Sequence, residues 1–162
     1  MSEVADYKLV RNACVGAELT EEKAKILAEK LGVRHLKDGE VLVREGEDDR
    51  TLFILVMGRL AVISKDTADG VDKHVYTMTE GECAGTRAFV KQSKRRATLR
   101  ALGDATVYTL DPDDFEELLD ANPRLAYMVM RALFRITHAN LARVNQESME
   151  LTNYITKTHG RY

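Results

Sequence analysis

The feature that most restricts the fold is a repeated pattern between residues 33 and 111, where short runs of strand-forming residues alternate with turns rich in glycine and acidic residues. Val, Ile, Leu, Thr and Tyr favour strands, and glycine supplies the backbone angles that tight hairpins need. The pattern predicts an all-β sandwich or roll with a hairpin at each turn. The runs are "EVLVRE", "TLFILVMG", "RLAVISKD", "KHVYTM", "TLRALG" and "ATVYTLD", and the turns are "KDGE", "REGEDD", "MGRL", "ADGVD" and "TEGE".

A helix is predicted before this region, over residues 19–32. Thr20 can cap its first turn, acidic residues follow at the positive end of the helix dipole, and Gly32 comes after the last turn. Its apolar face predicts that the helix packs against the rest of the chain. That face consists of Leu19, Ala24, Leu27, Ala28 and Leu31.

Two further helices are predicted after the strands, each opened by a proline. Proline suits the first helical position because its backbone angle is fixed and its missing amide hydrogen is not needed there. Asp111 and Pro112 open a short helix whose acidic residues favour its N-terminal end, rather than forming a catalytic or metal site. Pro123 opens a helix that meets no Gly or Pro until Gly160 and spans roughly 50 Å at about 1.5 Å per residue.

The long helix is expected to be apolar on two sides. A series of residues at steps of three or four approximates a coiled-coil seam, which predicts a homodimer through residues 125–155 with polar Asn140 helping to fix the register. A neighbouring stripe of Met130, Phe134 and Leu141 is expected to cover the β domain. The alternative is a long helix that folds back onto its own domain. The seam is Leu133, Ile136, Asn140, Val144, Glu147, Leu151 and Tyr154.

The length and composition predict one domain with helical appendages, divided into residues 1–32, 33–121 and 122–162. The first residues do not resemble a signal peptide, and the longest apolar run, "LFILVM", has strand length. We therefore expect a cytoplasmic protein without a membrane segment.

The net charge of −2 gives no general reason to bind nucleic acid. Cys14 and Cys83 lie far apart in the sequence and are expected to be buried free thiols.

Enzymatic chemistry is not predicted. The chain has no phosphate-binding loop ending in Gly-Lys-Ser/Thr, no dinucleotide-binding glycine fingerprint and no serine in a nucleophile elbow. Its histidines are scattered and lack the spacing of metal ligands. We therefore expect no catalytic residue and no metal site.

The segment Gly81–Ala101, "GECAGTRAFVKQSKRRATLRA", carries most of the functional information. Between Cys83 and Gly103 it contains six Lys or Arg residues and no acidic residue. The stretch "TRAFV" could form one helical turn whose free amides point at an anion, and Arg95 could face it, because a guanidinium matches phosphate oxygens bidentately. This predicts a phosphate clamp, and the alternative is a solvated basic loop.

These motifs resemble the cyclic-nucleotide-binding domain family, which includes the bacterial catabolite activator protein and the regulatory subunits of cyclic-AMP-dependent protein kinase. The resemblance covers about residues 7–150. It implies a double-stranded β-helix or jelly roll, the β-roll, followed by a long C-terminal helix of the dimerisation type. The matching stretches are "LKDGEVLVREGEDDRTLFILVMGRLAVIS", "GECAGTRAF", "RRATLRA" and "DPDDFEELLDANP".

The resemblance also implies a set of ligand-binding residues. In the family, a phosphate-binding cassette supplies backbone amides and one arginine to the cyclic phosphate, which here implies the amides near Arg87 and Ala88 and the guanidinium of Arg95. The long helix is expected to lie over the base, which makes Thr137, Asn140 and Arg143 candidate lid residues. The candidate site residues are Gly85, Thr86, Arg87, Ala88, Arg95, Arg96, Ala97, Thr98 and Asn140.

The cassette departs from the family pattern at three positions. Thr86 stands where a glutamate accepts the ribose 2′-hydroxyl, Arg87 replaces an aliphatic residue, and Arg96 replaces a small one. Replacing a charged acceptor by a hydroxyl forfeits on the order of 1.5–3 kcal/mol, or roughly 10- to 150-fold in affinity. We therefore expect weakened or altered binding of cyclic AMP or cyclic GMP, and easier binding of another anionic ligand.

The function expected from these observations is that of a non-catalytic regulatory sensor. It would bind a small anionic, nucleotide-like ligand and signal through its C-terminal helix to an unidentified effector protein. No helix-turn-helix is expected after the long helix, so direct DNA binding is not predicted. The alternative is a degenerate pocket in a dimerisation or protein-interaction module.

Overall fold

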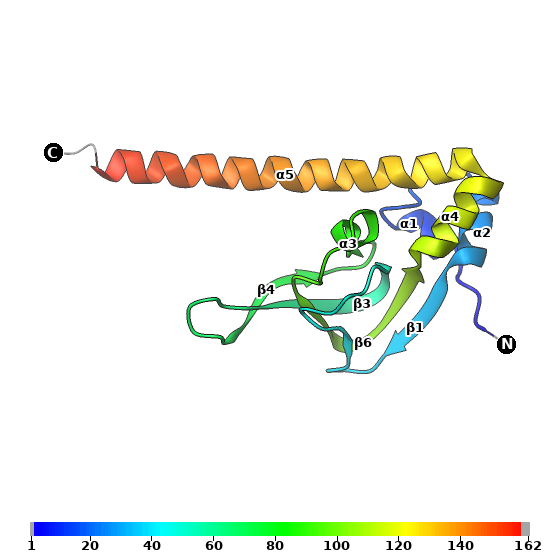
Figure 1. Cartoon of the computed structure of the whole chain (residues 1–162), viewed down its shortest axis with the longest axis horizontal. Helices are drawn as coiled ribbons and strands as arrows, with labels where there is room; N and C mark the ends of the chain where they lie inside the picture. Colours follow the sequence, from blue (N-terminus) through cyan, green and yellow to red (C-terminus); the bar gives the residue numbers. More distant parts are fainter. Residues whose placement is uncertain (1, 160–162) are drawn as a thin grey trace.

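Two long antiparallel strands, β3 (Leu52–Lys65) and β6 (Thr98–Leu110), form the centre of the computed structural model, which describes residues 2–159. The sheet has the order β1-β6-β3-β4, with β2 beside β6 and β5 beside β3, and Figure 1 shows α5 running along one side of this β-roll. The predicted mainly β fold with flanking helices is confirmed. The other elements are α1 (Tyr7–Asn12), α2 (Glu21–Lys30), β1 (Gly32–Leu36), β2 (Val41–Val43), β4 (Asp72–Met78), β5 (Cys83–Ala84), α3 (Thr86–Val90), α4 (Pro112–Ala121) and α5 (Pro123–His159).

A bulge at Gly58 bends β3. The register between β3 and β6 shifts between Leu55 and Arg59, and Gly58 has a φ angle of 86°. A side chain at this position would collide with the carbonyl oxygen of Asp104, so glycine keeps the two strands close at the bend. The expectation that "MGRL" forms a hairpin turn is therefore wrong. The two runs on either side of it are one bent strand that helps to curl the sheet. The expectation of a hairpin is also wrong for "KDGE", "REGEDD" and "TEGE", which connect strands that do not pair with each other, whereas "ADGVD" does join the paired strands β3 and β4.

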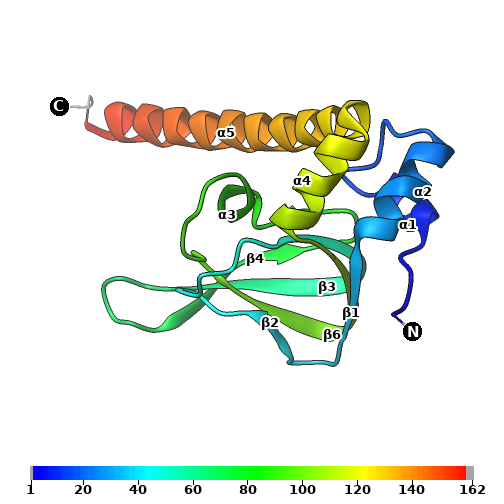
Figure 2. The ribbon, with the colours of Figure 1, turned by 45° about the vertical axis from the view of Figure 1, so that its right-hand side comes forward.

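Helices α1, α2 and α4 gather at the end of the roll where α5 begins, whereas α3 lies beside the middle of α5 (Figure 2). The predicted helix is present as α2, and the hydroxyl of Thr20 accepts a hydrogen bond from the Lys23 amide at 3.3 Å. Asp111 caps α4 by accepting from the Asp113 amide at 2.9 Å. The expected apolar face of α2 is buried in a core that α1, α4, α5, β3 and β6 also line. A second core, which includes Leu36, lies inside the roll.

Helix α5 presents a different face to the domain from the one predicted. Leu133 is 2% exposed and Ile136 packs against the same core, whereas Phe134 is 71% exposed. The expectation that Met130, Phe134 and Leu141 cover the β domain is therefore wrong as to burial, because the helix docks with the neighbouring stripe inward. Met130 and Phe134 only line a cavity beside α3. From residue 141 to residue 157 every residue is exposed. The C-terminal segment was expected to span residues 122–162, and residues 160–162 lie outside the described residues.

A disulfide joins Cys14 to Cys83, so the expectation of two free thiols is wrong. Cys14 lies in the turn after α1 and Cys83 in β5, with their Cα atoms 6.6 Å apart. The amide of Cys14 also donates a hydrogen bond to the carbonyl oxygen of Gly81 at 2.9 Å. The N-terminal turn folds back against β5, which brings together two cysteines that are distant in sequence.

Within residues 2–159, no helix combines the length and apolar character needed to cross a membrane.

Candidate functional site

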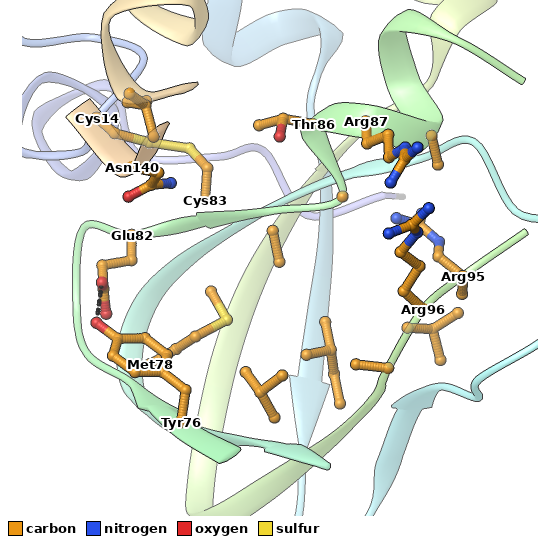
Figure 3. Close-up of a pocket in the computed structure, with 18 of the residues that line it drawn as sticks. Cys14, Tyr76, Met78, Glu82, Cys83, Thr86, Arg87, Arg95, Arg96 and Asn140 are labelled. Atoms are coloured by element: carbon orange, nitrogen blue, oxygen red, sulfur yellow. Dashed lines mark hydrogen bonds between the residues drawn. A yellow bond between two sulfur atoms is a disulfide. The ribbon is translucent and has the colours of Figure 1, made fainter. Parts of the chain in front are cut away.

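A cavity of about 470 Å³ lies between the β-roll, the segment from β5 to α3, and α5. Figure 3 shows arginine side chains gathered at one end of it and Tyr76 with Glu82 at the other. The walls in between are mostly apolar, and the disulfide forms part of them. The lining residues include Cys14, Val43, Val62, Tyr76, Met78, Glu82, Cys83, Ala84, Leu99, Ile136 and Arg143 besides the cassette.

Three guanidinium groups, those of Arg87, Arg95 and Arg96, converge on the positive end of the cavity (Figure 3). Arg87 and Arg96 are exposed, whereas Arg95 is only 6% exposed. Among the described residues, Asp49 is the one carboxylate within ion-pair distance of these three groups, with its Oδ1 3.4 Å from Nη2 of Arg95. The positive end therefore has an excess of cationic charge that an anion would offset.

Arg95 is held in the cavity wall from several directions. Its amide donates to the Glu47 carbonyl at 2.9 Å, and its own carbonyl accepts from the Gly46 amide at 2.8 Å. Its Nη2 donates to the carbonyl oxygen of Thr51, and its guanidinium lies 4.9 Å from the centre of the Phe53 ring. This arrangement orders the guanidinium before any ligand arrives, which lowers the entropic cost of binding.

The electrostatics of the Arg95–Asp49 pair follow from their burial. Burial lowers the pKa of the Arg95 guanidinium, and the nearby Asp49 carboxylate opposes that shift. Burial also opposes ionisation of Asp49, but hydrogen bonds from Thr51 and the charge of Arg95 together lower its pKa. The Nε atom of Arg95 is buried and has no hydrogen-bond partner among the described residues. A buried N–H of this kind is stabilised by a hydrogen bond to an acceptor, for instance an anionic oxygen of a ligand.

The opposite end of the cavity holds a hydrogen-bonded carboxylate. The hydroxyl of Tyr76 donates to Oε1 of Glu82 at 2.5 Å, and the amide of Thr79 donates to its Oε2 at 2.6 Å. The hydrogen bond to Glu82 raises the pKa of Tyr76. Because both oxygens of Glu82 are engaged and the side chain lies across the cavity from the arginines, Glu82 does not replace the carboxylate missing at Thr86 (Figure 3).

Helix α5 contributes Ile136, Asn140 and Arg143 to the cavity, at steps of four and three that place them on one face. Asn140 therefore lies on the cavity side, and its expected place on the outward seam is wrong. Thr137, expected beside it, lies elsewhere: its hydroxyl donates to the Leu133 carbonyl at 2.9 Å and it lines a second cavity of about 460 Å³ between α3 and α5.

The structure brings all the candidate site residues except Thr98 to the lining of the first cavity. Thr98 instead begins β6, and its hydroxyl accepts a hydrogen bond from the Glu45 amide at 3.0 Å. Sequence reasoning missed the disulfide, Tyr76 and Glu82. The sequence held a signal for the disulfide and for Tyr76. Cys83 lies two positions before Gly85 of the cassette, and Tyr76 lies on the same strand face as Met78.

Within the described part of the chain, no three His, Cys, Asp or Glu side chains gather into a potential metal site.

Comparison with known proteins gives a consistent result. A family model for the cyclic nucleotide-binding domain matches residues 33–122, more than half of the chain. An uncharacterised NTE-family protein of Mycobacterium tuberculosis is 27% identical over 128 residues, which are 78% of this chain but only 21% of that protein. The chain thus corresponds to about a fifth of that relative.

Solved structures agree on the fold. A cyclic nucleotide-binding domain from Methylobacillus flagellatus superposes with a TM-score of 0.82 at 16% identity, covering 93% of this chain and 88% of that one. The catabolite activator protein of Thermus thermophilus superposes with a TM-score of 0.76 at 17% identity, covering 86% and 63%. At these identities the likeness concerns the arrangement of the β-roll and its helices.

Proposed function

Because this chain belongs to the cyclic nucleotide-binding domain family, we propose that it is a non-catalytic regulatory sensor that binds a small anionic, nucleotide-like ligand in the cavity beside α3. The observation that carries this proposal is Arg95, which is buried in the cavity wall instead of turning to solvent and whose Nε has no partner among the described residues. Burying a charge is costly, and Asp49 leaves the Nε of Arg95 without a partner among the described residues, so an anionic ligand would offset part of that cost.

The ligand would lie along the cavity with its phosphate at the arginine end. The positive end would take one or more anionic oxygens, and the rest of the ligand would extend past the apolar walls toward Tyr76, Asn140 and Arg143. A volume of about 470 Å³ is in the range of small-ligand pockets. Since Thr86 supplies no charge to balance the guanidiniums, the site favours a ligand with more negative charge than a cyclic mononucleotide, such as a cyclic dinucleotide.

Signalling would pass through α5, which contributes residues to the cavity. A ligand that contacts Asn140 and Arg143 prefers one position of the helix over the roll and shifts the population toward it. The helix would report that shift to an effector protein or to a second copy of the chain.

A second copy is the partner that we propose for the outward face of α5. An apolar stripe on this face repeats at alternating steps of four and three residues, which is the spacing of a coiled-coil seam. Phe134, Leu141 and Leu151 on this stripe are 71%, 56% and 60% exposed. Pairing two such helices within residues 125–155 would bury them. The stripe consists of Met130, Phe134, Thr137, Leu141, Val144, Ser148 and Leu151. Its first three residues also line the second cavity, between α3 and α5.

The second candidate function is a dimerisation or protein-interaction module whose pocket no longer binds a nucleotide. The observation that favours it is Thr86, because the family position for the ribose-binding carboxylate is occupied by a hydroxyl. In that case α5 and its outward stripe would be the functional part of the chain.

Calorimetric titration of the full chain with cyclic AMP, cyclic GMP and cyclic dinucleotides distinguishes the two functions. A sensor releases or absorbs heat with at least one of these ligands, and Arg95→Ala abolishes the signal. Arg100→Ala removes an exposed arginine that does not line the cavity, so this control should bind like the wild type. The absence of heat and of thermal stabilisation with every nucleotide would favour the interaction module.

A further inference from the structure

We propose that the disulfide between Cys14 and Cys83 is a thiol–disulfide exchange site whose oxidation state sets the ligand affinity of the cavity. The part of this inference that concerns affinity rests on the proposed function. The part that concerns the exchange reaction and its effect on the cavity wall does not. The two cysteines of the chain are distant in sequence, and the fold brings both of them to the lining of this cavity.

The disulfide joins the N-terminal turn to a short part of the wall. This part is also held to β3, because the amide of Leu55 donates to the Glu82 carbonyl at 2.9 Å and the amide of Gly81 donates to the Leu55 carbonyl at 2.7 Å. Strand β5 has two residues, Cys83 and Ala84, and among the described strands it pairs with β3 alone. It leads directly to Gly85, which precedes α3 and touches the guanidinium of Arg95. Besides the disulfide, the N-terminal turn is tied to this segment by the hydrogen bond from the Cys14 amide to Gly81. Breaking the disulfide therefore loosens the backbone that positions the cassette.

The disulfide lies in the lining of the cavity. Both cysteines are partly exposed, and both line the same space as Arg87, Arg95 and Arg96. A thiolate reductant is an anion, so the guanidiniums of the cavity favour its approach. An occupant of the cavity would cover the disulfide, because the bond forms part of the wall that encloses the occupant (Figure 3).

The reaction is an exchange with a dithiol. One thiolate of the dithiol attacks a sulfur of the disulfide, forms a mixed disulfide and releases the other cysteine as a thiolate that takes up a proton. The second thiol of the reductant then attacks the mixed disulfide, closes the oxidised dithiol and releases the first cysteine. The net step moves two electrons and two protons from the dithiol to the protein, leaving two cysteine thiols.

The oxidised form is the one that binds the ligand more tightly. With the disulfide closed, β5 and the start of α3 are already ordered, so binding does not have to fix them. Coupling between two sites is reciprocal, so a ligand that prefers the oxidised form must also disfavour reduction. We expect reduction to weaken binding by about 5- to 150-fold, the usual span of such coupling.

The exchange site is tested without any ligand. Full-length protein purified in air is compared with the same protein reduced by dithiothreitol, with free thiols counted by iodoacetamide mass shifts and backbone opening followed by hydrogen exchange. We expect no free thiols before reduction and two after it, and exchange in residues 81–90 at least about fivefold faster in the reduced form. Exchange in β1, remote from the disulfide, should not change. The Cys14→Ser/Cys83→Ser double variant should resemble the reduced protein and ignore dithiothreitol.

The effect on affinity is then measured by titrating cyclic AMP and a cyclic dinucleotide into the oxidised and reduced proteins. Weaker binding after reduction, together with slower reduction in the presence of the bound nucleotide, supports the proposal. Two free thiols in the air-purified protein, equal exchange in residues 81–90 in both forms, or equal affinities in both forms would overturn it. If the oxidised protein binds no nucleotide at all, the sensor function fails, while thiol counts and hydrogen exchange still decide whether the disulfide is an exchange site.

Discussion

The guanidinium of Arg95 lies directly against the backbone of Gly85, so close that a side chain at position 85 would overlap its Nη1 atom. Gly85 also has a φ angle of 83°, a conformation that residues with a Cβ atom rarely adopt. Two separate requirements therefore keep this position a glycine. One concerns the turn from β5 into α3, and the other concerns the space for the buried arginine.

Gly85→Ala is expected to displace Arg95 as well as strain the turn. A Cβ atom at positive φ costs about 1–2 kcal/mol, and the overlap with Arg95 adds roughly 1–3 kcal/mol. Gly39→Ala is the matched control, because Gly39 has a φ angle of 79° and open space around it. Urea unfolding should show the larger loss of stability for Gly85→Ala. Equal losses for both variants would mean that Arg95 is free to move aside.

The Asp49–Arg95 pair predicts a pH-dependent contribution to stability. The pKa of Asp49 is lowered in the folded protein, so its carboxylate stabilises the fold above the ordinary pKa of 3.8, and this stability is lost as the pH falls through the folded value. We expect Asp49→Asn to reduce the free energy of unfolding by about 1 kcal/mol at pH 7 and by almost nothing near pH 2. Asp48→Asn, at the exposed neighbour, is the control in urea titrations at both pH values. If Asp49→Asn lowered the free energy of unfolding equally at both pH values, the negative charge of Asp49 would not be what stabilises the fold.

Thr86→Glu restores the acidic residue that the family has at this position. The new carboxylate would accept a hydrogen bond from a ribose hydroxyl and offset part of the cationic charge, so cyclic AMP should bind roughly 10- to 150-fold more tightly than to the wild type. Thr86→Gln has nearly the same size without the charge and should gain much less. Calorimetry measures both variants. If glutamate bound cyclic AMP no better than glutamine, the position would not face the ribose.

Dimerisation is expected to depend on the outward stripe of α5. Phe134→Glu/Leu141→Glu places two charges on the proposed seam, where like charges of two copies would meet in an apolar contact. Sedimentation should give a dimer of the 18.2 kDa chain for the wild type and a monomer for the double variant. Ala139→Glu adds a charge on another exposed face of the helix and should leave the dimer intact. A monomeric wild type, or equal disruption by Ala139→Glu, would rule out this seam.

The helix starts could be predicted from the sequence because their signals act within one turn. Thr20 caps α2, Asp111 caps α4, and each proline stands at the first position of the helix that it was expected to open. The breaks in the strands were harder to predict, since glycine serves both tight turns and bulges. At Gly58 the chain bends without reversing, and Gly103 likewise lies inside β6. Only the pairing of β3 with β6 across the sheet distinguishes a glycine inside a strand from a glycine in a tight turn.

Features that join distant segments could not be read from local patterns. The faces of α5 are ambiguous in sequence, because Leu133 and Phe134 lie on two adjacent apolar stripes and docking on the core decides which one is buried. The cassette is nearly contiguous, so its residues were expected together and do line one cavity. Cys14 and Tyr76 reach the same cavity from other elements, and that placement depends on the folded chain.

In the proposed signalling mechanism, the exposed part of α5, residues 141–157, would act as a lever with its pivot at the cavity. At about 1.5 Å per residue this arm is roughly 25 Å long, so a tilt of about 5° at Asn140 moves its far end by roughly 2 Å. A displacement too small to repack the core beneath Leu133 is thus magnified along the arm. The tip of the helix is where a change in the cavity becomes largest.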